Sequence, residues 1–375
     1  MQPIQMVDLK GQYQKIKNQI DVSIQNVIDS TAFINGPEVK AFQKELEEYL
    51  DVKHVIPCAN GTDALQIAMM ALGLEPGDEV ITADFTFAAT VEVIAVLKLT
   101  PILVDVEKDT FNIDIEALKK SITPKTKAII PVHLFGQCAN MEAVLEIAKQ
   151  HNLYVIEDTA QAIGADYSFA NGSTKKAGTI GDIGTTSFFP SKNLGCYGDG
   201  GAIFTNNDDL AHKLRGIVNH GMYKRYYHDE VGVNSRLDSI QAAVLRVKLP
   251  LLDTYCNARR KVAEHYNHAF SNTTNLTTPI TSSFTTHVFH QYTLVLHGID
   301  RGKLQQHLSD KNIASAIYYP VPLHSQKAYT DTRYNEDDFS VTNELCKTVL
   351  SLPIHTEFEE DQLKYITDAV LEFCK

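Results

Sequence analysis

The chain lacks the surplus of lysine and arginine that a nucleic-acid-binding surface needs. Its 375 residues include 34 Lys and Arg against 46 Asp and Glu, a net charge of −12. An acidic surface repels a phosphate backbone, so we expect no nucleic-acid partner. A small anionic substrate is still compatible with this charge, because one basic pocket can lie inside an acidic protein.

The chain also lacks paired cysteines, metal-ligand spacings and long apolar runs. Its six cysteines are scattered with no CxxC pair, and no HExxH histidine pair occurs. We therefore expect reduced thiols and no metal site. The first ten residues do not form a signal peptide, and no uncharged apolar run approaches the roughly 20 residues that span a bilayer. These features predict a soluble cytoplasmic protein without a membrane partner.

Short β-branched runs alternate with helical patterns through the first two thirds of the chain. The runs are nearly all apolar, as strands buried on both faces should be. We predict strands at 54–57, 78–82, 101–105, 127–134 and 153–157. We predict helices at 39–50, 63–72, 87–97 and 141–151. The pattern indicates an α/β fold with a mostly parallel sheet covered by helices.

The alternation ends near Asp182. Residues 185–189 and 202–205 are typical of strands around a glycine-rich turn, and 208–218 of a helix. Residues 223–233 indicate a polar aromatic loop, and a long helix bent at Pro250 is predicted from 238 to 270. The last ninety residues predict the order βαβαα. We expect a large domain over 1–250 and a smaller C-terminal α+β domain over 251–375, with the N-terminal segment a candidate to pack on the smaller one.

Three polar motifs stand in this framework. Asp158 ends an apolar strand, where ligands of open α/β sheets bind, although an N-cap or a metal ligand would also explain it. Lys192 follows a strand among Phe, Pro and Gly residues; a partly desolvated amine there is a usable Schiff-base nucleophile, and the alternative is a glycine-rich hairpin with an incidental lysine. Asn60-Gly61-Thr62 opens a helix and can hold a phosphate, or is a plain N-cap turn.

The phosphate motif is neither a Walker loop nor the GxGxxG of a dinucleotide-binding fold. A phosphate cradle, a carboxylate and a lysine are together what pyridoxal 5′-phosphate (PLP) needs. The carboxylate keeps the pyridine nitrogen protonated, and the lysine holds the aldehyde carbon and later moves protons. The three motifs therefore favour a PLP enzyme over a NAD enzyme, which needs no such lysine.

The chain resembles the DegT/StrS-type family of nucleotide-sugar aminotransferases, which have the PLP fold-type-I architecture. The resemblance covers nearly the whole chain. It is carried by Asp8-Leu-Lys, Asn35-Gly-Pro-Glu, Cys58-Ala-Asn-Gly-Thr-Asp-Ala-Leu, Pro131-Val-His-Leu-Phe-Gly-Gln, Glu157-Asp-Thr-Ala-Gln-Ala, Ser187-Phe-Phe-Pro-Ser-Lys, Gly232-Val-Asn-Ser-Arg-Leu-Asp and Tyr319-Pro-Val-Pro-Leu-His.

The resemblance implies a role for each matching residue. Lys192 would be the Schiff-base lysine, and Asp158 would pair with the pyridine nitrogen. The other implied cofactor contacts are Gly61, Thr62, Phe87, Gln161, Ser187 and, from the neighbouring subunit, Asn234. A contact from the neighbour requires a homodimer with shared active sites.

Within the family, the chain is most similar to bacterial 3-aminotransferases that act on UDP-2-acetamido-2-deoxy-3-oxo-D-glucuronate. This likeness implies L-glutamate as amino donor, 2-oxoglutarate as its product, and a place in surface-polysaccharide (O-antigen) biosynthesis. A guanidinium suits the carboxylate of a uronic acid, which makes Arg236 a candidate; a structural ion pair at the dimer interface is its alternative. Tyr318 stands where a uronate-specific relative is expected to have histidine.

Two histidines are further substrate candidates. His133 ends a predicted strand and is equally compatible with a packed, hydrogen-bonded side chain. His324 lies in a loop beside Pro322, and a solvated loop is its alternative. Three other functions stay open: a 4-keto-sugar (UDP or dTDP) aminotransferase, a PLP sugar dehydratase and a non-catalytic sensor. Some dehydrating relatives have His where Lys192 stands, so the lysine favours transamination. The intact set of cofactor residues speaks against a sensor.

Overall fold

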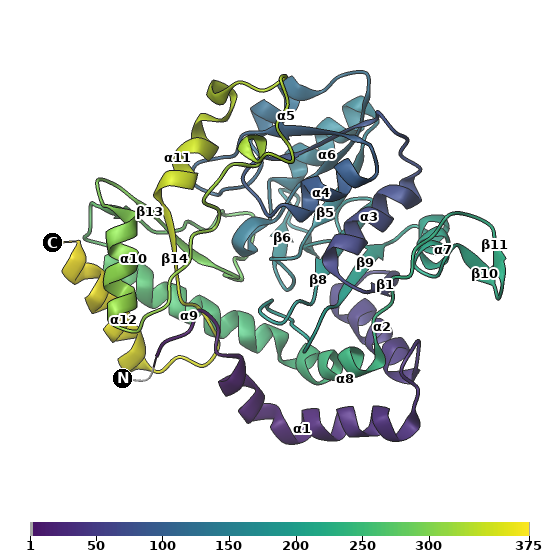
Figure 1. Cartoon of the computed structure of the whole chain (residues 1–375), viewed down its shortest axis with the longest axis horizontal. Helices are drawn as coiled ribbons and strands as arrows, with labels where there is room; N and C mark the ends of the chain where they lie inside the picture. Colours follow the sequence, from purple (N-terminus) through teal and green to yellow (C-terminus); the bar gives the residue numbers. More distant parts are fainter. Residues whose placement is uncertain (1–2, 375) are drawn as a thin grey trace.

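The structure is a computed structural model that describes residues 3–374. Its centre is a seven-stranded sheet in the order β1-β9-β8-β5-β4-β2-β3 (Figure 1). β9 is antiparallel to both of its neighbours, and the other neighbouring pairs are parallel. The strands are β1 (His54–Cys58), β2 (Glu79–Ala83), β3 (Thr100–Val104), β4 (Thr126–Ile130), β5 (Tyr154–Asp158), β8 (Ile183–Ser187) and β9 (Gly201–Thr205). The predicted α/β fold with a mostly parallel sheet is confirmed.

Both faces of this sheet are buried, which explains its apolar strands. Successive residues point to opposite faces, so Val155 joins the core on one side and Ile156 the core on the other. One face packs on α2 (Pro37–Leu50), α5 (Ile115–Ser121), α6 (Met141–His151) and α8 (Ser239–Lys248). The other face packs on α3 (Gly61–Leu72), α4 (Ala89–Val96) and α7 (Asp208–Ile217).

A second, three-stranded antiparallel sheet lies toward the C-terminal end of the chain. Its strands are β12 (Leu276–Thr277), β13 (Tyr292–Leu296) and β14 (Val349–Leu352). Three helices supply its core, namely α9 (Leu252–Phe270), α10 (Arg301–Asp310) and α12 (Glu360–Phe373). Ile4 pairs with Ile313 and joins the same core. The domain division near residue 250 stays a prediction.

Several elements differ from the sequence prediction. The order after β13 is α10, α11 (Ser340–Thr348), β14 and α12, so βαβαα is wrong: a second helix precedes the last strand. The strand predicted at 127–134 ends at Ile130, and a 3-10 turn, η1 (Leu134–Gly136), follows. The N-terminal helix α1 (Leu9–Ser30) was not predicted. It packs Ile16 and Ile20 on Val244 of α8.

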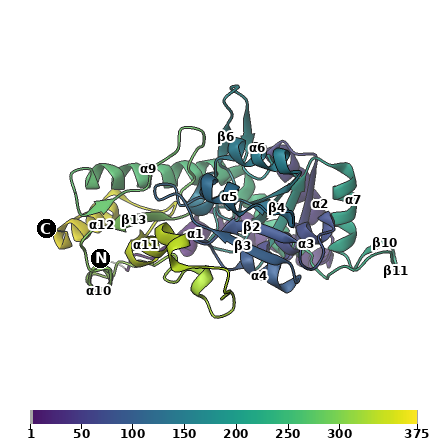
Figure 2. The same ribbon diagram turned by 90° about the horizontal axis from the view of Figure 1, so that it is seen from above.

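Two hairpins project from the body in Figure 2. One is formed by β6 (Asp166–Ser168) and β7 (Thr174–Lys176), the other by β10 (Met222–Lys224) and β11 (Tyr227–His228). The second corrects the prediction of a plain loop at 223–233. The bend at Pro250 is confirmed, because a 3-10 turn, η2 (Leu249–Leu251), separates α8 from α9. Two further 3-10 turns are η3 (Leu323–Ser325) and η4 (Glu336–Phe339).

No helix within residues 3–374 is both long and apolar enough to cross a bilayer. The same residues contain no group of three or more His, Cys, Asp or Glu side chains placed to hold a metal ion.

Candidate active site

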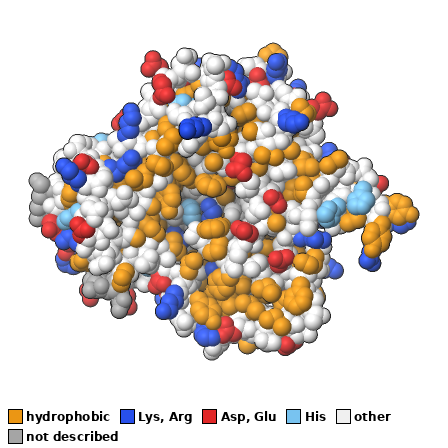
Figure 3. Space-filling model, viewed as in Figure 1, with side chains coloured by type: hydrophobic (Ala, Val, Ile, Leu, Met, Phe, Trp, Pro, Cys, Tyr) orange, Lys and Arg blue, Asp and Glu red, His pale blue; other side chains and the backbone are white. Residues whose placement is uncertain are grey.

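A cavity of about 570 Å³ opens at the carboxyl ends of the parallel strands. Ligands of open α/β sheets bind at this edge, because the loops that leave the strands converge there. A hollow with hydrophobic rims and blue and pale-blue atoms inside is visible near the middle of the face in Figure 3. Eight of the residues singled out in the sequence line the cavity: Gly61, Thr62, Phe87, Asp158, Gln161, Ser187, Lys192 and Tyr318.

Asp158 is the last residue of β5 and is 6% exposed. Its Oδ2 accepts a hydrogen bond from Thr90 Oγ1 of α4 at 2.8 Å, and its Oδ1 accepts one from the Ala160 N–H at 3.1 Å. These two bonds fix the plane of the carboxyl group. Because an ionised carboxylate has about four acceptor positions, it can still accept a bond from a protonated ring nitrogen.

Lys192 lies in the segment between β8 and β9 and reaches the same cavity. Its Nζ has no hydrogen-bond or ion-pair partner within the described part of the chain. The surrounding protein replaces water around the amine and lowers the pKa of Lys192 to about 8, although the negative charge of Asp158 opposes this shift. An amine with this pKa is partly unprotonated near neutral pH and can attack a carbonyl carbon.

The segment that carries Lys192 is held by buried polar contacts. Asn193 Nδ2 donates to the Val288 carbonyl oxygen at 3.0 Å, and the buried Lys248 Nζ donates to the Gly195 carbonyl oxygen at 2.6 Å. Gly195 passes so close to its own segment that an added Cβ would lie 2.3 Å from the Pro190 carbonyl oxygen. A side chain at position 195 would therefore displace the lysine.

The start of α3 forms an anion cradle in the same cavity. Asn60 caps the helix, and its Oδ1 accepts from the Asp63 N–H at 2.7 Å. Helix N-termini attract phosphate, because their first N–H groups have no partner within the helix. An added Cβ on Gly61 would lie 2.7 Å from the Ser187 Cβ, so glycine keeps this space open. The cradle, the unpaired lysine and the oriented carboxylate fit PLP.

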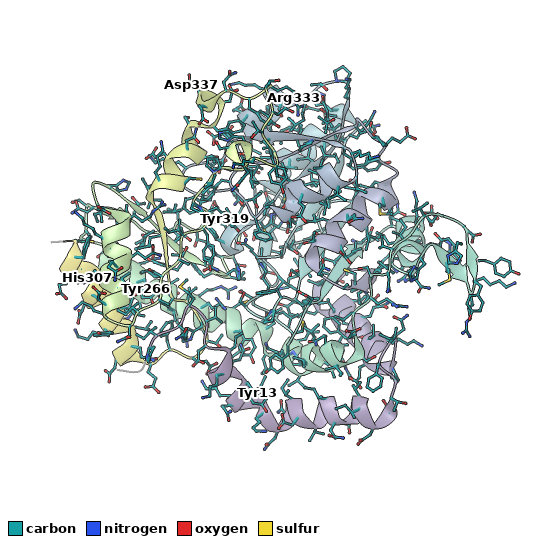
Figure 4. All side chains as sticks on the ribbon, viewed as in Figure 1. Tyr13, Tyr266, His307, Tyr319, Arg333 and Asp337 are labelled. Carbon is teal, nitrogen blue, oxygen red and sulfur yellow. The ribbon has the colours of Figure 1, made fainter. Side chains whose placement is uncertain are left out.

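Gln161 and several aromatic side chains, among them Phe87, Tyr318 and Tyr319, border the cavity. Gln161 Oε1 accepts from the Phe135 N–H at 2.9 Å, and its Nε2 donates to the Tyr319 hydroxyl at 3.1 Å. Tyr319, labelled near the middle of Figure 4, lies 6.4 Å from Phe87 between ring centroids. Phe87 is 58% exposed, so its ring is available to a planar ligand. Tyr318 lines the same wall.

His133 does not line the cavity. It is fully buried, its Nδ1 accepts from the Ala139 N–H at 3.1 Å, and its Nε2 therefore donates to Glu157 Oε2 at 2.9 Å. Glu157 also accepts from the N–H groups of Gly178, Ile180 and Gly181. Burial alone would raise the pKa of Glu157, but these hydrogen bonds outweigh burial and lower it. This geometry fits the packed, hydrogen-bonded alternative for His133.

His324 also lies outside the lining of the cavity. Its backbone N–H and its Nδ1 both contact the carboxylate of Asp84, each at 2.7 Å, and its ring stacks on Phe339. These contacts give the side chain a structural part in joining η3 to the end of β2. The substrate role expected for His324 gains no support from its position.

Asn234 and Arg236 do not line the cavity formed by this chain either. They lie between the β10–β11 hairpin and α8; Asn234 is exposed and Arg236 half-buried. The expected contribution of both residues was to a neighbour's site, and this stays a prediction.

In the adjoining hairpin, the guanidinium of Arg225 lies over the ring of Tyr226.

Several residues of the site were missed. Thr90 orients Asp158 from 68 positions away, and no local pattern distinguishes it from other helix residues. Thr86, Phe189, Asp199, His290 and Gln291 line the cavity as well. Phe189 and Asp199 belong to the segment around Lys192 and had a sequence signal, whereas His290 and Gln291 enter from the small sheet.

Comparison with known proteins gives a consistent result. A model of the DegT/DnrJ/EryC1/StrS aminotransferase family matches residues 14–371. A "Pleiotropic regulatory protein" of Geobacillus stearothermophilus is 46% identical over 99% of both chains. A UDP-2-acetamido-2-deoxy-3-oxo-D-glucuronate aminotransferase of Pseudomonas aeruginosa is 43% identical over 98% of this chain and 99% of its own. Other relatives are named for dTDP- and GDP-linked sugars.

A solved structure of NtdA from Bacillus subtilis with bound cofactor PMP has a TM-score of 0.91 and 30% identity, covering all of this chain and 86% of the other.

Proposed function

The chain belongs to the DegT/DnrJ/EryC1/StrS family and is a PLP-dependent sugar aminotransferase, and from that premise we propose that its amino acceptor is a UDP-linked 3-oxo sugar of the glucuronate type. The proposed substrate is UDP-2-acetamido-2-deoxy-3-oxo-D-glucuronate, and the proposed donor is L-glutamate. The 43% identity to an enzyme named for this sugar supports the substrate. The proposed setting is the cytoplasmic synthesis of surface polysaccharide.

The observation that carries the PLP-dependent function is one cavity shared by three kinds of group. An amine without a partner, a carboxylate fixed by two hydrogen bonds and a helix start kept open by Gly61 converge there. Each group suits one part of the cofactor, namely its carbonyl carbon, its ring nitrogen and its phosphate. A simple binding protein would need the phosphate cradle but not a lysine with a lowered pKa.

Bound PLP supplies an electron sink for the carbon that loses a proton. Asp158 would hold the ring nitrogen in its protonated form, because a carboxylate accepts a charge-assisted hydrogen bond from a protonated nitrogen. The amine of Lys192 would take the proton from the carbon that carries the donor's amino group and pass it to the adjacent cofactor carbon, and it would run the same transfer in reverse when the keto sugar is aminated. Gln161 holds the adjoining wall, since both ends of its amide are hydrogen bonded.

The uronate carboxylate needs a cation that this chain does not place in its own cavity. Among the described lining residues, Asp158 and Asp199 are acidic and Lys192 is basic. Lys192 has to stay available for proton movement. We therefore propose that Arg236 of a second copy meets the carboxylate and that Asn234 of that copy meets the phosphate, which makes the working unit a homodimer.

A panel of keto sugars tests the acceptor. We would incubate the holoenzyme with L-glutamate and each of several UDP- and dTDP-linked 3-keto and 4-keto sugars, with and without the uronate carboxylate, and identify amino sugars by mass spectrometry. The expected product comes from the UDP-linked 3-oxo uronate. Amination of non-uronate sugars alone would contradict the proposed substrate and the role of Arg236.

The name of the Geobacillus relative directs attention to a regulatory alternative. Adding L-glutamate alone to the yellow holoenzyme distinguishes it from transamination. An aminotransferase loses its visible absorbance and releases one 2-oxoglutarate per site, whereas a sensor or a dehydratase releases none.

A further inference from the structure

His290 is a cavity-lining residue that neither the sequence motifs nor the proposed chemistry has used. It lies just before β13 and is 5% exposed. Of the histidines in the described part of the chain, it alone lines the cavity. It enters from the segment that leads into β13 of the small sheet.

The backbone around His290 is held by side chains from two directions. Asn193, next to Lys192 in the chain, donates from Nδ2 to the Val288 carbonyl oxygen at 3.0 Å. From α9, the buried Arg259 donates from Nη1 to the carbonyl oxygens of Phe289 at 3.2 Å and His290 at 3.4 Å. The first contact links the position of the histidine directly to the segment that carries the reactive lysine.

The same backbone also contains a residue with a strained, positive φ angle. Phe289 has a φ of 44°, and Phe135, on the facing segment, has a φ of 56°. Bulky residues rarely adopt this left-handed region, and such strain persists where the surroundings fix the backbone. The two segments are joined by the Val288 N–H to the Gly136 carbonyl oxygen at 2.8 Å, and an added Cβ on Gly136 would lie 2.9 Å from the Phe289 nitrogen. The placement of the histidine ring is therefore built into the fold.

One ring nitrogen of His290 is buried, and the other is available to a ligand. Nδ1 is buried and has no hydrogen-bond partner among residues 3–374. A buried lone pair without a partner is less costly than a buried N–H without one, so we assign the proton to Nε2. Burial, and after it the positive charges of Lys192 and Arg259, lower the pKa of His290 well below its usual value. The cavity thus contains a neutral N–H donor near the lysine.

Both substrates carry an oxygen close to the carbon that reacts. In an α-amino acid the carboxylate is bonded to the carbon that reacts next to Lys192. In the proposed sugar, the carbons that flank the keto group carry neutral oxygen or amide groups. The described lining contains no arginine. An arginine here would suit the carboxylate but would become an unpaired buried charge when the neutral sugar bound, which is costly.

We propose that His290 is a shared specificity residue, whose Nε2–H donates to the α-carboxylate of the amino donor in one half of the reaction and to a neutral oxygen beside the keto carbon of the sugar in the other. This inference rests on the proposed transfer from L-glutamate. A neutral donor serves both ligands without leaving a charge uncompensated in either complex.

The test uses a donor analogue that binds without turnover. 2-Methyl-L-glutamate carries the α-carboxylate but has no α-proton to lose, and its binding to the holoenzyme is read from the change in visible absorbance. His290→Phe keeps the ring but removes the donor, and we expect its dissociation constant to rise about 10- to 150-fold. His290→Gln keeps an N–H donor at similar reach, and we expect its constant to stay within about 3-fold of wild type. The KM for the keto sugar should follow the same order.

His355→Phe is the matched control. His355 is as buried as His290, but it stacks on Phe358 and lies outside the cavity lining. Its replacement should leave the dissociation constant unchanged. Wild-type affinity in His290→Phe would overturn the inference while leaving the proposed function intact, and equal losses in His290→Phe and His290→Gln would also overturn it, because packing would then explain the effect. If the wild type binds no analogue, the proposed donor is wrong and the inference falls with it.

Discussion

Two walls of the active-site cavity are built in different ways. The wall from the large sheet carries Asp158 at the end of β5, Lys192 after β8 and the helix start at Gly61, each within a short run of sequence. The wall near the small sheet carries His290 and Gln291 before β13, with Tyr318 and Tyr319 further along the chain. Local motifs therefore suffice for the cofactor wall, whereas the substrate wall depends on how distant segments meet.

This contrast predicts how substitutions in each wall should affect activity. A substitution in the cofactor wall should affect every substrate alike, because every turnover passes through the same cofactor. A substitution in the substrate wall should change the preference among substrates. The comparison fails if the two classes of variant behave in the same way.

Replacing Lys192 with Ala should have the largest effect, namely loss of detectable turnover with every sugar. The variant also loses the group that borohydride traps on PLP, so peptide mapping should find the pyridoxyl tag at position 192 in the wild type and nowhere in Lys192→Ala. Lys364→Ala, on the exposed face of α12, is the control and should keep full activity. Undiminished transamination by Lys192→Ala would refute the assignment.

Replacing Asp158 with Asn should have the next largest effect. Loss of one partner of a buried charged hydrogen bond costs about 2–5 kcal/mol, or roughly 30- to 5,000-fold. We expect weaker PLP retention on dialysis and a kcat/KM that falls by this order for all substrates. Thr90→Val, which removes only the bond that orients Asp158, should cost about 3- to 10-fold. Full activity of Asp158→Asn would remove the electron-sink argument.

The pH dependence of cofactor loading should show a smaller, graded effect. In the cofactor-free chain the pKa of Lys192 is lowered to about 8. The unprotonated fraction that attacks PLP should therefore fall about 10-fold for each pH unit below 8 and level off above it. Rates of reconstitution measured by absorbance between pH 6 and 10 check this. Asp158→Asn should move the midpoint to lower pH, because Asp158 raises the pKa; a wild-type midpoint near 10.5 would contradict the prediction.

Replacing His133 with Phe should have the smallest effect on catalysis. The change removes one of the two donors to Glu157 Oε2 and leaves the buried Ala139 N–H without its acceptor, so we expect a loss of about 1–3 kcal/mol in stability. KM values for the donor and the sugar should remain those of the wild type, once the protein is folded and loaded. Thermal unfolding and steady-state kinetics on the same preparation separate the two effects. A rise in the KM for the sugar alone would contradict this prediction and support a substrate contact for His133.

The sequence was informative where structure is local. Apolar runs predicted the parallel sheet, because a strand buried on both faces needs apolar residues at every position. The glycine-rich run around Lys192 predicted the turn back to β9. The N-terminal helix α1 was missed, since Ile16 and Ile20 are buried only because α8 lies beside them. Tertiary contact, and not local preference, decides such elements.

The candidate site shows the same division. Asp158, Lys192 and Gly61 could be chosen because their neighbours in sequence create the environment that their chemistry needs. His133 and His324 were also chosen from their sequence context. In the structure each is hydrogen bonded to a buried carboxylate, His133 to Glu157 and His324 to Asp84, and no sequence pattern reveals those pairings. His290 gave no signal, because its environment is made by Asn193 and Arg259 from other parts of the chain.

The reversed strand β9 has a mechanical consequence. Because β9 returns antiparallel beside β8, the segment that bears Lys192 has both of its ends anchored on one pair of adjacent strands, and Asp158 ends the strand on the other side of β8. Bending or twisting of the sheet therefore carries amine and carboxylate along as one unit. The hydrogen bond from Asn193 Nδ2 to the Val288 carbonyl oxygen also ties this segment to the backbone before His290, so movement of the small sheet would act on the lysine through that contact.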